Sequence, residues 1–568
     1  MRYYLARNFN RVKHVLNRFS GQDFIIALFG TASVVGLVFL CSGGFYYQTE
    51  SDTVFPTYMF GMYSGGSNVL PNTFGCFSGI SYWFNLVYSY GISSDIYDWF
   101  QLISVFCCAV YWVYSLIRAR KTPWLMIPVL VSLLDPILPF EFSKTAMFLS
   151  ITGLHILTEK TRLFPIITGV FLVSLGFLVR PEPVVISMVI FFLATLLNFP
   201  ASQKKLTALV LPFLSVTFLS LVFLNSERTT EDAYYKEFRK YEYTLVDFRK
   251  GLINDDGLKP AERIKLQAAQ NFFFADREEL NLDFFRSLEI QPLDKTPISL
   301  VKAFSKSGWV KNGWGRFTEG VFCLKFHFLT LLLTALLLWK KNRAEAWLLV
   351  LSTFIIVLFS VFLKTEHHFI TSTMMAALLL TGVSKDKLPS KTEATSLPKR
   401  GLIIVLVMIL STLMFLEKAR LVSTSKKKSD YYQLVQNKLE DFQPNSLVFN
   451  ISYWDKLHYR LFSTVQPKAH DKVVVIDGGA LYLNGNYQTL MYNMTGENRF
   501  VEQFLYLVKE EKIFVSSRER MELITNYMNV VHGLDLHFIT LMVFNKDDSS
   551  LNTPTIGLHQ FSQQATPQ

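Results

Sequence analysis

The stretch Phe24–Leu40, FIIALFGTASVVGLVFL, decides the fold, because it places 17 uncharged residues directly after a basic N-terminal segment. About 20 such residues cross the hydrocarbon core of a bilayer as one helix. A cleaved signal peptide would need a small-residue cleavage site, which Phe39-Leu40-Cys41 does not offer. The stretch therefore predicts a retained first span, with the basic segment before it in the cytoplasm.

The rest of the chain repeats this apolar pattern. Half of the 568 residues are hydrophobic, 18% are charged, and the mean hydropathy is +0.27. Soluble domains carry about 25% charged residues, so the composition excludes a disordered chain and argues against a soluble enzyme. Eleven further apolar runs follow the first one, at about 76–92, 100–117, 124–140, 145–158, 163–179, 183–199, 206–225, 320–338, 346–363, 367–383 and 402–416.

Basic loops decide which of these runs cross the membrane, because short basic loops stay in the cytoplasm. They lie at 118–121, 159–162, 203–205, 340–343 and 384–400. If all twelve runs crossed, these loops would face outside, whereas all five face inside if 76–92 does not cross. Small and polar residues, such as Gly79 and Asn85, also interrupt that run. We therefore predict an α-helical polytopic membrane protein with eleven spans, in which 76–92 forms an external re-entrant or interfacial helix.

This topology divides the chain into membrane modules and extracytoplasmic parts. The loop at 226–319 exceeds ordinary loop lengths and should carry its own structure. Aromatic and apolar residues from Tyr234 to Phe248 recur there at helical spacing. The predicted parts are a cytoplasmic basic N-terminus (1–22), an N-terminal membrane module (23–225) with an external loop (43–99), an external mostly helical loop (226–319), a C-terminal membrane module (320–416), an extracytoplasmic α/β domain (417–546) and a disordered tail (547–568).

The α/β domain is predicted because short β-rich runs alternate with helical stretches after the last span. The expected strands are Leu447–Ile451, Val473–Ile476, Ile513–Val515 and Phe538–Phe544, and the expected helices are Tyr431–Asp441, Phe500–Glu510 and Arg518–Val531. Polar residues predict that the end is frayed. The cluster Lys426-Lys427-Lys428 joins span to domain on the outer face, where it departs from the positive-inside rule.

Ionisable side chains at the external ends of spans are the candidate functional residues, because charges near a membrane are costly to keep. They are Glu50, Asp52, Asp135, Lys144, Arg180, Glu182, His367 and His368. Glu50 and Asp52 could act as a general base or bind a divalent cation through oxygen, and they could equally belong to a solvated loop. Arg180 could clamp a phosphate in a bidentate way or anchor the chain at the interface.

The remaining candidates and motifs are less specific. Asp135 and Lys144 could bind substrate or close their turn with a salt bridge. Adjacent histidines point about 100° apart on a helix, so His367 and His368 do not form a zinc pair. The five Cys give no disulfide framework or zinc spacing. No P-loop, kinase, G-x-S-x-G or H-E-x-x-H motif occurs, so a divalent cation at Glu50 and Asp52 is the single cofactor to consider.

The opening of the chain resembles that of GT-C superfamily glycosyltransferases, with an acidic residue after the first span, an interfacial helix and a second span ending in basic residues. It also resembles a diffuse group of bacterial polysaccharide-polymerase-like membrane proteins of mostly unknown function. The matching residues are Asp52, Ser64-Gly65, Pro71, Leu86-Val87-Tyr88, Trp99-Phe100, Phe142–Ala146, Arg180-Pro181-Glu182, Tyr241-Glu242-Tyr243 and Asp247-Phe248. Lys144 replaces a threonine of the group, and Thr365–His368 stands in place of an arginine motif, which leaves the acceptor and the exact reaction open.

The resemblance implies transfer or polymerisation of sugars from a polyprenyl-phosphate carrier at the outer face of a bacterial plasma membrane. We expect Asp52, or secondarily Glu50, to deprotonate the acceptor, and Arg180 with Lys144 to stabilise the leaving phosphate. Asp135, Glu182, His367 and His368 complete the expected substrate-binding set. The expected partners are the lipid-linked donor, a glycan or lipid acceptor and the bilayer, without nucleic acid. Alternatives are a lipid or oligosaccharide transporter and a non-catalytic membrane assembly protein.

Overall fold

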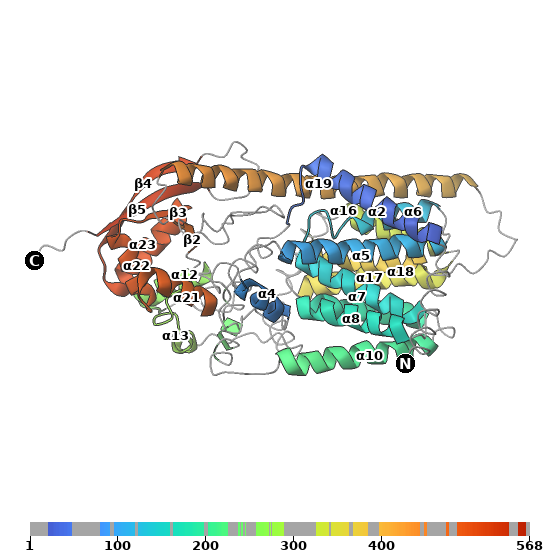
Figure 1. The fold of residues 1–568 in the computed structure, drawn as a ribbon, viewed down its shortest axis with the longest axis horizontal. Helices are drawn as coiled ribbons and strands as arrows, with labels where there is room; N and C mark the ends of the chain where they lie inside the picture. The colour runs from blue at the N-terminus through green and yellow to red at the C-terminus, as the bar shows by residue number, and fades with distance from the viewer. Residues whose placement is uncertain are drawn as a thin grey trace, which may run out of the picture.

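The computed structural model shows a helical bundle at one end and an α/β domain at the other, joined by one long helix (Figure 1). It describes residues 21–47, 80–90, 96–119, 123–159, 163–197, 203–224, 234, 237–238, 240–241, 245, 257–271, 273, 275–288, 318, 325–339, 342–362, 367–383, 397–442, 448–450, 473–475, 485–544 and 555–563.

Eleven helices of the described residues match the eleven predicted spans in position. They are α2 (Gly21–Ser42), α5 (Ile96–Ala119), α6 (Pro123–Leu133), α7 (Phe142–Glu159), α8 (Leu163–Val179), α9 (Pro181–Leu197), α10 (Gln203–Leu219), α16 (Lys325–Trp339), α17 (Arg343–Phe362), α18 (His367–Val383) and α19 (Leu397–Phe442). By length and composition, α2, α5 and residues Gly401–Val435 of α19 could each cross a membrane, and shorter apolar segments lie in α8, α9, α10, α16 and α18.

The outer faces of these helices are apolar. Leu40 of α2 is 74% exposed, Phe164 of α8 is 78% exposed and Phe213 of α10 is 61% exposed. Soluble monomers rarely expose apolar surface on this scale, whereas a bilayer covers it. The predicted α-helical polytopic membrane protein with a small C-terminal α/β domain is therefore confirmed.

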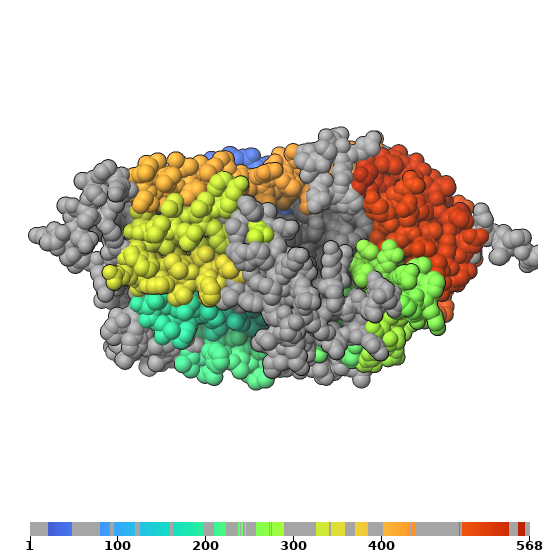
Figure 2. All heavy atoms as spheres, turned by 180° about the vertical axis from the view of Figure 1, so that it is seen from behind, coloured from blue at the N-terminus to red at the C-terminus, as the bar shows by residue number. Residues whose placement is uncertain are grey.

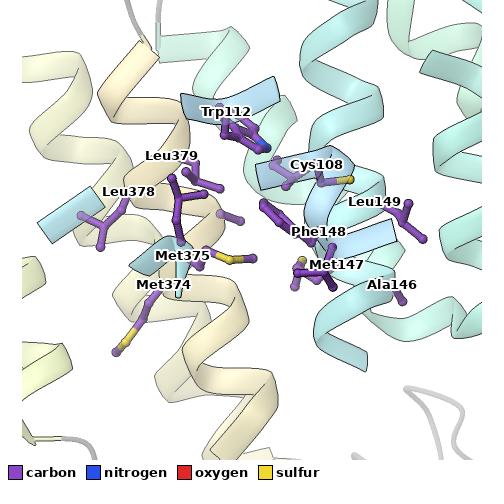
Figure 3. Packing of buried hydrophobic residues seen from close by; sticks show 14 of the residues in the cluster. Cys108, Trp112, Ala146, Met147, Phe148, Leu149, Met374, Met375, Leu378 and Leu379 are labelled. Carbon is purple, nitrogen blue, oxygen red and sulfur yellow. The ribbon is translucent and has the colours of Figure 1, made fainter. Parts of the chain in front are cut away.

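The interior of the bundle is packed from α5, α7 and α18. Figure 3 shows Cys108 and Trp112 of α5, Met147 and Phe148 of α7, and Met374 and Leu378 of α18 in one apolar cluster. The indole Nε1 of Trp112 donates to Thr152 Oγ1 at 2.8 Å, which pairs the polar atoms of two facing helices. This core fixes the relative positions of the helix ends that carry the candidate residues.

Run 76–92 does not form a span among the described residues. Helix α4 (Ile80–Ser89) has 10 residues, about 15 Å of helix, which is half the thickness of a bilayer core. It lies at the end of the bundle that faces the α/β domain (Figure 1). Trp83, Leu86 and Tyr90 are exposed on one side, while Ile80, Phe84 and Tyr88 are buried. These features agree with the predicted interfacial helix.

The described helix ends next to the five predicted basic loops lie at one end of the bundle. The ends of α2, α6 and α8 and the starts of α7 and α16 meet in one set of contacts at the end that faces the α/β domain. Helices α5, α7 and α16 therefore finish at the opposite end, where α19 also begins (Figure 1). Which of the two ends is cytoplasmic stays a prediction.

The α/β domain contains a five-stranded sheet in the order β2-β1-β3-β5-β4. Strands β1 (Val448–Asn450), β2 (Val473–Val475) and β3 (Ile513–Ser517) pair in parallel, and β4 (Leu536–Phe544) and β5 (Ile556–Gln563) extend the sheet antiparallel. The four strands expected from the sequence are β1 to β4. Helices α21 (Gly485–Thr495), α22 (Phe500–Lys509) and α23 (Arg518–His532) complete this part.

Three expectations about the extramembrane parts need correction. The predicted disordered tail includes β5, whose position in the middle of the sheet requires pairing with both β3 and β4. The predicted helix Tyr431–Asp441 is the end of α19, because no helix-breaking residue separates it from the last span. The external loop is not a separate part, because α12 (Pro260–Gln270) and α13 (Leu282–Ser287) share an apolar core with α22 and α23. Figure 2 shows residues 257–288 against the C-terminal domain.

The topology can be tested with reporter fusions. Fusions at Lys205 and Lys341 should read cytoplasmic, and a fusion at Gly533, in the turn after α23, should read external, because the bundle separates the two ends. A phosphatase and fluorescent-protein pair at each position measures this directly. An external signal at Lys205 or Lys341 would contradict the predicted orientation.

Candidate functional site

The start of α7 organises the bundle end that faces the α/β domain. Glu141 precedes the helix and is fully buried; its Oε2 accepts from the backbone N of Lys144 at 3.0 Å, and its Oε1 accepts from Ser143 Oγ at 2.8 Å. A side-chain acceptor at this position satisfies backbone donors that the first helical turn leaves unpaired. The carboxylate also brings a negative charge to the helix N-terminus, where it is favourable.

Lys144 turns back into the loop before α7. Its Nζ donates to the carbonyl oxygens of Asp135 at 3.0 Å and Pro139 at 3.1 Å, and it lies 3.7 Å from Asp135 Oδ1. Both side chains are almost fully buried. Of the two roles considered for Asp135 and Lys144, the geometry favours the salt bridge that closes the turn.

Asp135 also binds Lys418 of α19, whose Nζ donates to the same Oδ1 oxygen and is equally buried. Two lysines thus share one carboxylate, while Asp135 Oδ2 makes no hydrogen bond. Next to Lys418 along α19, Glu417 contacts Nδ1 of His327, at the start of α16, at 3.1 Å. Two ion pairs at Asp135 and the polar contact between His327 and Glu417 therefore hold the turn, α7, α16 and α19 together at this level.

Arg180 lies at the rim of the cluster, between the end of α8 and the start of α9. Its Nη1 donates to Ser143 Oγ and lies 3.9 Å from Glu141 Oε1, and its Nε lies 3.4 Å from Glu182 Oε2. The guanidinium carbon stands 5.2 Å from the centre of the Phe142 ring. The side chain is 26% exposed, whereas Lys144 and Lys418 are 1% and 2% exposed. Arg180 is thus the most accessible of these three cations.

The segment after α2 reaches the same place. The backbone N of Phe140 donates to Tyr46 O at 2.9 Å, and Tyr47 forms a parallel bridge with Phe140. The Tyr47 hydroxyl donates to Asp98 Oδ1 at 2.5 Å, at the start of α5. Phe140 and Phe142 flank Glu141, so the chain leading to Glu50 and Asp52 starts beside the residues that Arg180 touches.

Not every expected residue can be placed. Glu50 and Asp52 lie outside the described residues, and only the backbone of His367 and His368, at the start of α18, is described. The structure joins Asp135 to Lys144, and Arg180 to Glu182. Among the described residues, no group of three His, Cys, Asp or Glu side chains could hold a metal ion.

Sequence reasoning missed Lys418 as a member of the cluster. The last apolar run ends at 416, so Lys418 was expected just beyond the membrane module, in the extracytoplasmic part. Its partner Asp135 is 283 residues away in the chain, and a single sequence carries no signal for such a pair. Gln101 of α5 was missed for the same reason, since it contacts Thr145 of α7 and Tyr97 inside the bundle.

A second buried carboxylate ties the external loop to the α/β domain. Asp276 Oδ2 accepts from the Tyr527 hydroxyl at 3.0 Å and contacts His532 Nε2 at 2.5 Å. Burial and the adjacent Asp276 carboxylate raise the pKa of Tyr527, so its hydroxyl stays protonated as a donor. Arg520 also donates to the carbonyl of Asn271. We interpret this cluster as the joint between the two segments.

The Asp135 pair can be tested through stability. Asp135→Asn keeps the size of the side chain but leaves two buried lysines without a counter-charge, so it should lower the free energy of unfolding by about 3–5 kcal/mol. Thermal melting of the detergent-purified protein, followed by size-exclusion chromatography, measures the loss. Asp283→Asn, at a carboxylate that is 88% exposed, is the matched control.

Adding Lys418→Gln to Asp135→Asn should recover part of the loss, because one unpaired charge is then removed. If Asp135→Asn alone has the same melting temperature as the wild type, the buried pair does not hold the turn.

Comparisons with known proteins leave the family of this chain open. No protein-family model matches it, and no curated protein matches it in sequence. Among solved structures, the chain is similar to ArnT from Cupriavidus metallidurans in the apo state, with 11% identity, a TM-score of 0.42, and coverage of 95% of this chain and 98% of that one. At this identity and score, the roles of individual residues have to come from this chain's own contacts.

Proposed function

We propose that the protein is a membrane glycosyltransferase of the GT-C type, which transfers a sugar or oligosaccharide from a polyprenyl-phosphate carrier to a glycan or lipid acceptor. One observation carries the proposal: the segment Tyr46–Tyr47 is bonded to Phe140, beside the residues that Arg180 touches. Arg180, a cation suited to phosphate, and the start of the segment that leads to Glu50 and Asp52, here called the acidic loop, are therefore neighbours at one end of the bundle.

The acidic loop supplies the base in this proposal. Glu50 is three residues after Tyr47, and Asp52 is five residues after it. An extended chain covers about 3.3–3.6 Å per residue, so chain length alone keeps Glu50 within about 11 Å and Asp52 within about 18 Å of Tyr47. Either carboxylate can accept the proton of an acceptor hydroxyl, with Asp52 as the first choice.

Arg180 binds the phosphate of the donor. Its planar guanidinium offers paired donors to phosphate oxygens, and its partial exposure leaves access from the bundle end. Ser143, Glu141 and Phe142 hold the side chain from the other side. For Lys144, which the sequence analysis expects to assist, the burial and the contacts in the turn support a structural role in this proposal. Asp135 belongs to the turn with it, and Glu182 orients Arg180 from the exposed side.

The reaction exchanges one bond for another at the anomeric carbon of the sugar. The acceptor oxygen forms a bond to the anomeric carbon as the bond between that carbon and the phosphate oxygen breaks. The polyprenyl phosphate leaves with the electron pair, and the hydroxyl proton passes to the carboxylate. Negative charge develops on the leaving phosphate, where a positioned Arg180 stabilises it.

A transporter is the weaker alternative. Transport would favour repeated halves and interrupted helices near the middle of the membrane. The sequence has no internal repeat, and the charged cluster lies at one end of the described bundle. These features support chemistry at one membrane face, on the side that the predicted topology makes extracytoplasmic.

Asp52→Asn should abolish transfer while the protein still folds and inserts, because it removes a charge with little change in volume. Asp535→Asn, at a carboxylate that is 53% exposed in the α/β domain, is the matched control. The measurement is recovery of the surface glycan or glycolipid that a deletion strain loses, quantified by mass spectrometry after complementation. Full recovery with Asp52→Asn would exclude Asp52 as the general base. If Glu50→Gln is inactive while Asp52→Asn is active, Glu50 is the base instead.

Arg180→Lys should be almost as damaging as Arg180→Ala, because lysine offers a point charge in place of a two-pronged donor. Loss of such a contact costs about 2–5 kcal/mol, so we expect a fall in transfer of roughly 30-fold or more. Arg518→Lys, at a guanidinium that is 79% exposed, is the control. An interfacial anchor would tolerate lysine, so near-normal transfer by Arg180→Lys would remove Arg180 from phosphate binding.

A further inference from the structure

A basic surface lies on α19 where this helix leaves the bundle. Residues 417–430, EKARLVSTSKKKSD, hold five Lys or Arg and two acidic residues. Arg420, Lys426 and Lys427 are exposed, while Lys418 and Glu417 are engaged inside the bundle. In the predicted topology this cluster faces outside, so the positive-inside rule does not account for it.

One exposed side of α19 changes from apolar to basic along the helix. Ile409 is 50% exposed and Leu416 is 54% exposed. Arg420 and Lys427, both exposed, follow at spacings of four and seven residues. At 3.6 residues per turn, these four positions lie within about 40° of one another around the helix axis. We call them the lipid face of α19.

The contacts of α2 set the depth of this face in the membrane. Helix α2 has 22 residues, about 33 Å, close to the ~30 Å thickness of a bilayer core. Its end lies beside α19 (Figure 1). A Cβ built on Gly43, directly after α2, would lie 3.4 Å from Lys426 Nζ. Lys426 and Lys427 therefore stand at the level where a bilayer's phosphate groups begin.

We propose that the lipid face of α19 binds an anionic phospholipid, with its phosphate between Arg420 and Lys427 and its acyl chains along Leu416 and Ile409. Lys427 lies about 16 Å beyond Leu416 along the helix, and Arg420 lies about 10 Å before Lys427, so both long side chains reach one head group. Arginine gives paired donors to phosphate oxygens, and lysine adds a point charge. Lys426 strengthens the positive field, and Asp430 offsets part of it.

A membrane lipid fits this surface better than a free phosphate ion. A free ion needs only the two cations, whereas the exposed Ile409 and Leu416 continue the same side of the helix toward the bilayer centre. Acyl chains cover such side chains without cost, and a nearby anionic surface contributes roughly a 5-fold gain in affinity per basic residue. The proposal does not depend on sugar transfer, because it concerns the outer side of α19.

The test uses the purified full chain reconstituted with equal amounts of phosphatidylglycerol and phosphatidylcholine, then washed in detergent. Native mass spectrometry counts the lipids that remain bound. The wild type should retain phosphatidylglycerol in preference to phosphatidylcholine, and R420Q/K427Q should retain at least about 10-fold less of it. Lys438→Gln is the matched control, because Lys438 is exposed on the same side of α19, eleven residues further from the membrane.

Each outcome bears on the proposal. Equal retention of phosphatidylglycerol by R420Q/K427Q and wild type, or no preference for this lipid in the wild type, would overturn it. Release of the lipid by millimolar inorganic phosphate would identify a free-ion site instead. If R420Q/K427Q does not fold, a salt titration of the wild type decides, since retention that does not fall between 50 and 500 mM NaCl (about a threefold change in Debye length) excludes a charged contact.

Discussion

The carboxylate of Asp135, shared by Lys144 and Lys418, is the interaction on which the rest of the site depends. It fixes the turn between α6 and α7 and attaches α19 to that turn. Removing one partner would leave an uncompensated charge in a buried place, which costs more than the pair itself contributes. The start of α7 is held by the same turn, and with it Glu141 and Ser143, which support Arg180.

Helix α19 links this charge cluster to the α/β domain. It is continuous over 46 residues, so the position of Lys418 in the bundle also sets the position of Tyr431 and Val435, which pack against β3 and β5. The joint at Asp276 adds the external loop to the same domain. The continuous helix α19 therefore sets the position of the α/β domain relative to the bundle end that faces it.

Accessibility separates the cations of this cluster into a buried group and an exposed one. Lys144 and Lys418 are buried against Asp135, which makes them part of the fold, whereas Arg180 remains partly exposed beside the segment that leads to Glu50 and Asp52. This division supports phosphate binding by Arg180 alone. On the other side of α19, Arg420 and Lys427 are exposed, and in our proposal they bind a lipid head group, so that one helix would present charge both to the site and to the bilayer.

The sequence by itself determined the positions and order of the eleven bundle helices among the described residues, the short α4 and four of the five strands, because hydrophobic periodicity and loop charge are local properties. It also indicated candidate functional residues, because a charged side chain near a membrane is energetically costly to keep. These candidates include Asp135, Lys144, Arg180 and Glu182. Only the tertiary structure showed which partners these side chains contact. The partner of Asp135 on α19 lies 283 residues away, and β5, in a polar segment, is ordered by pairing with both neighbours. Such contacts depend on which segments meet in space, and local pattern does not encode that.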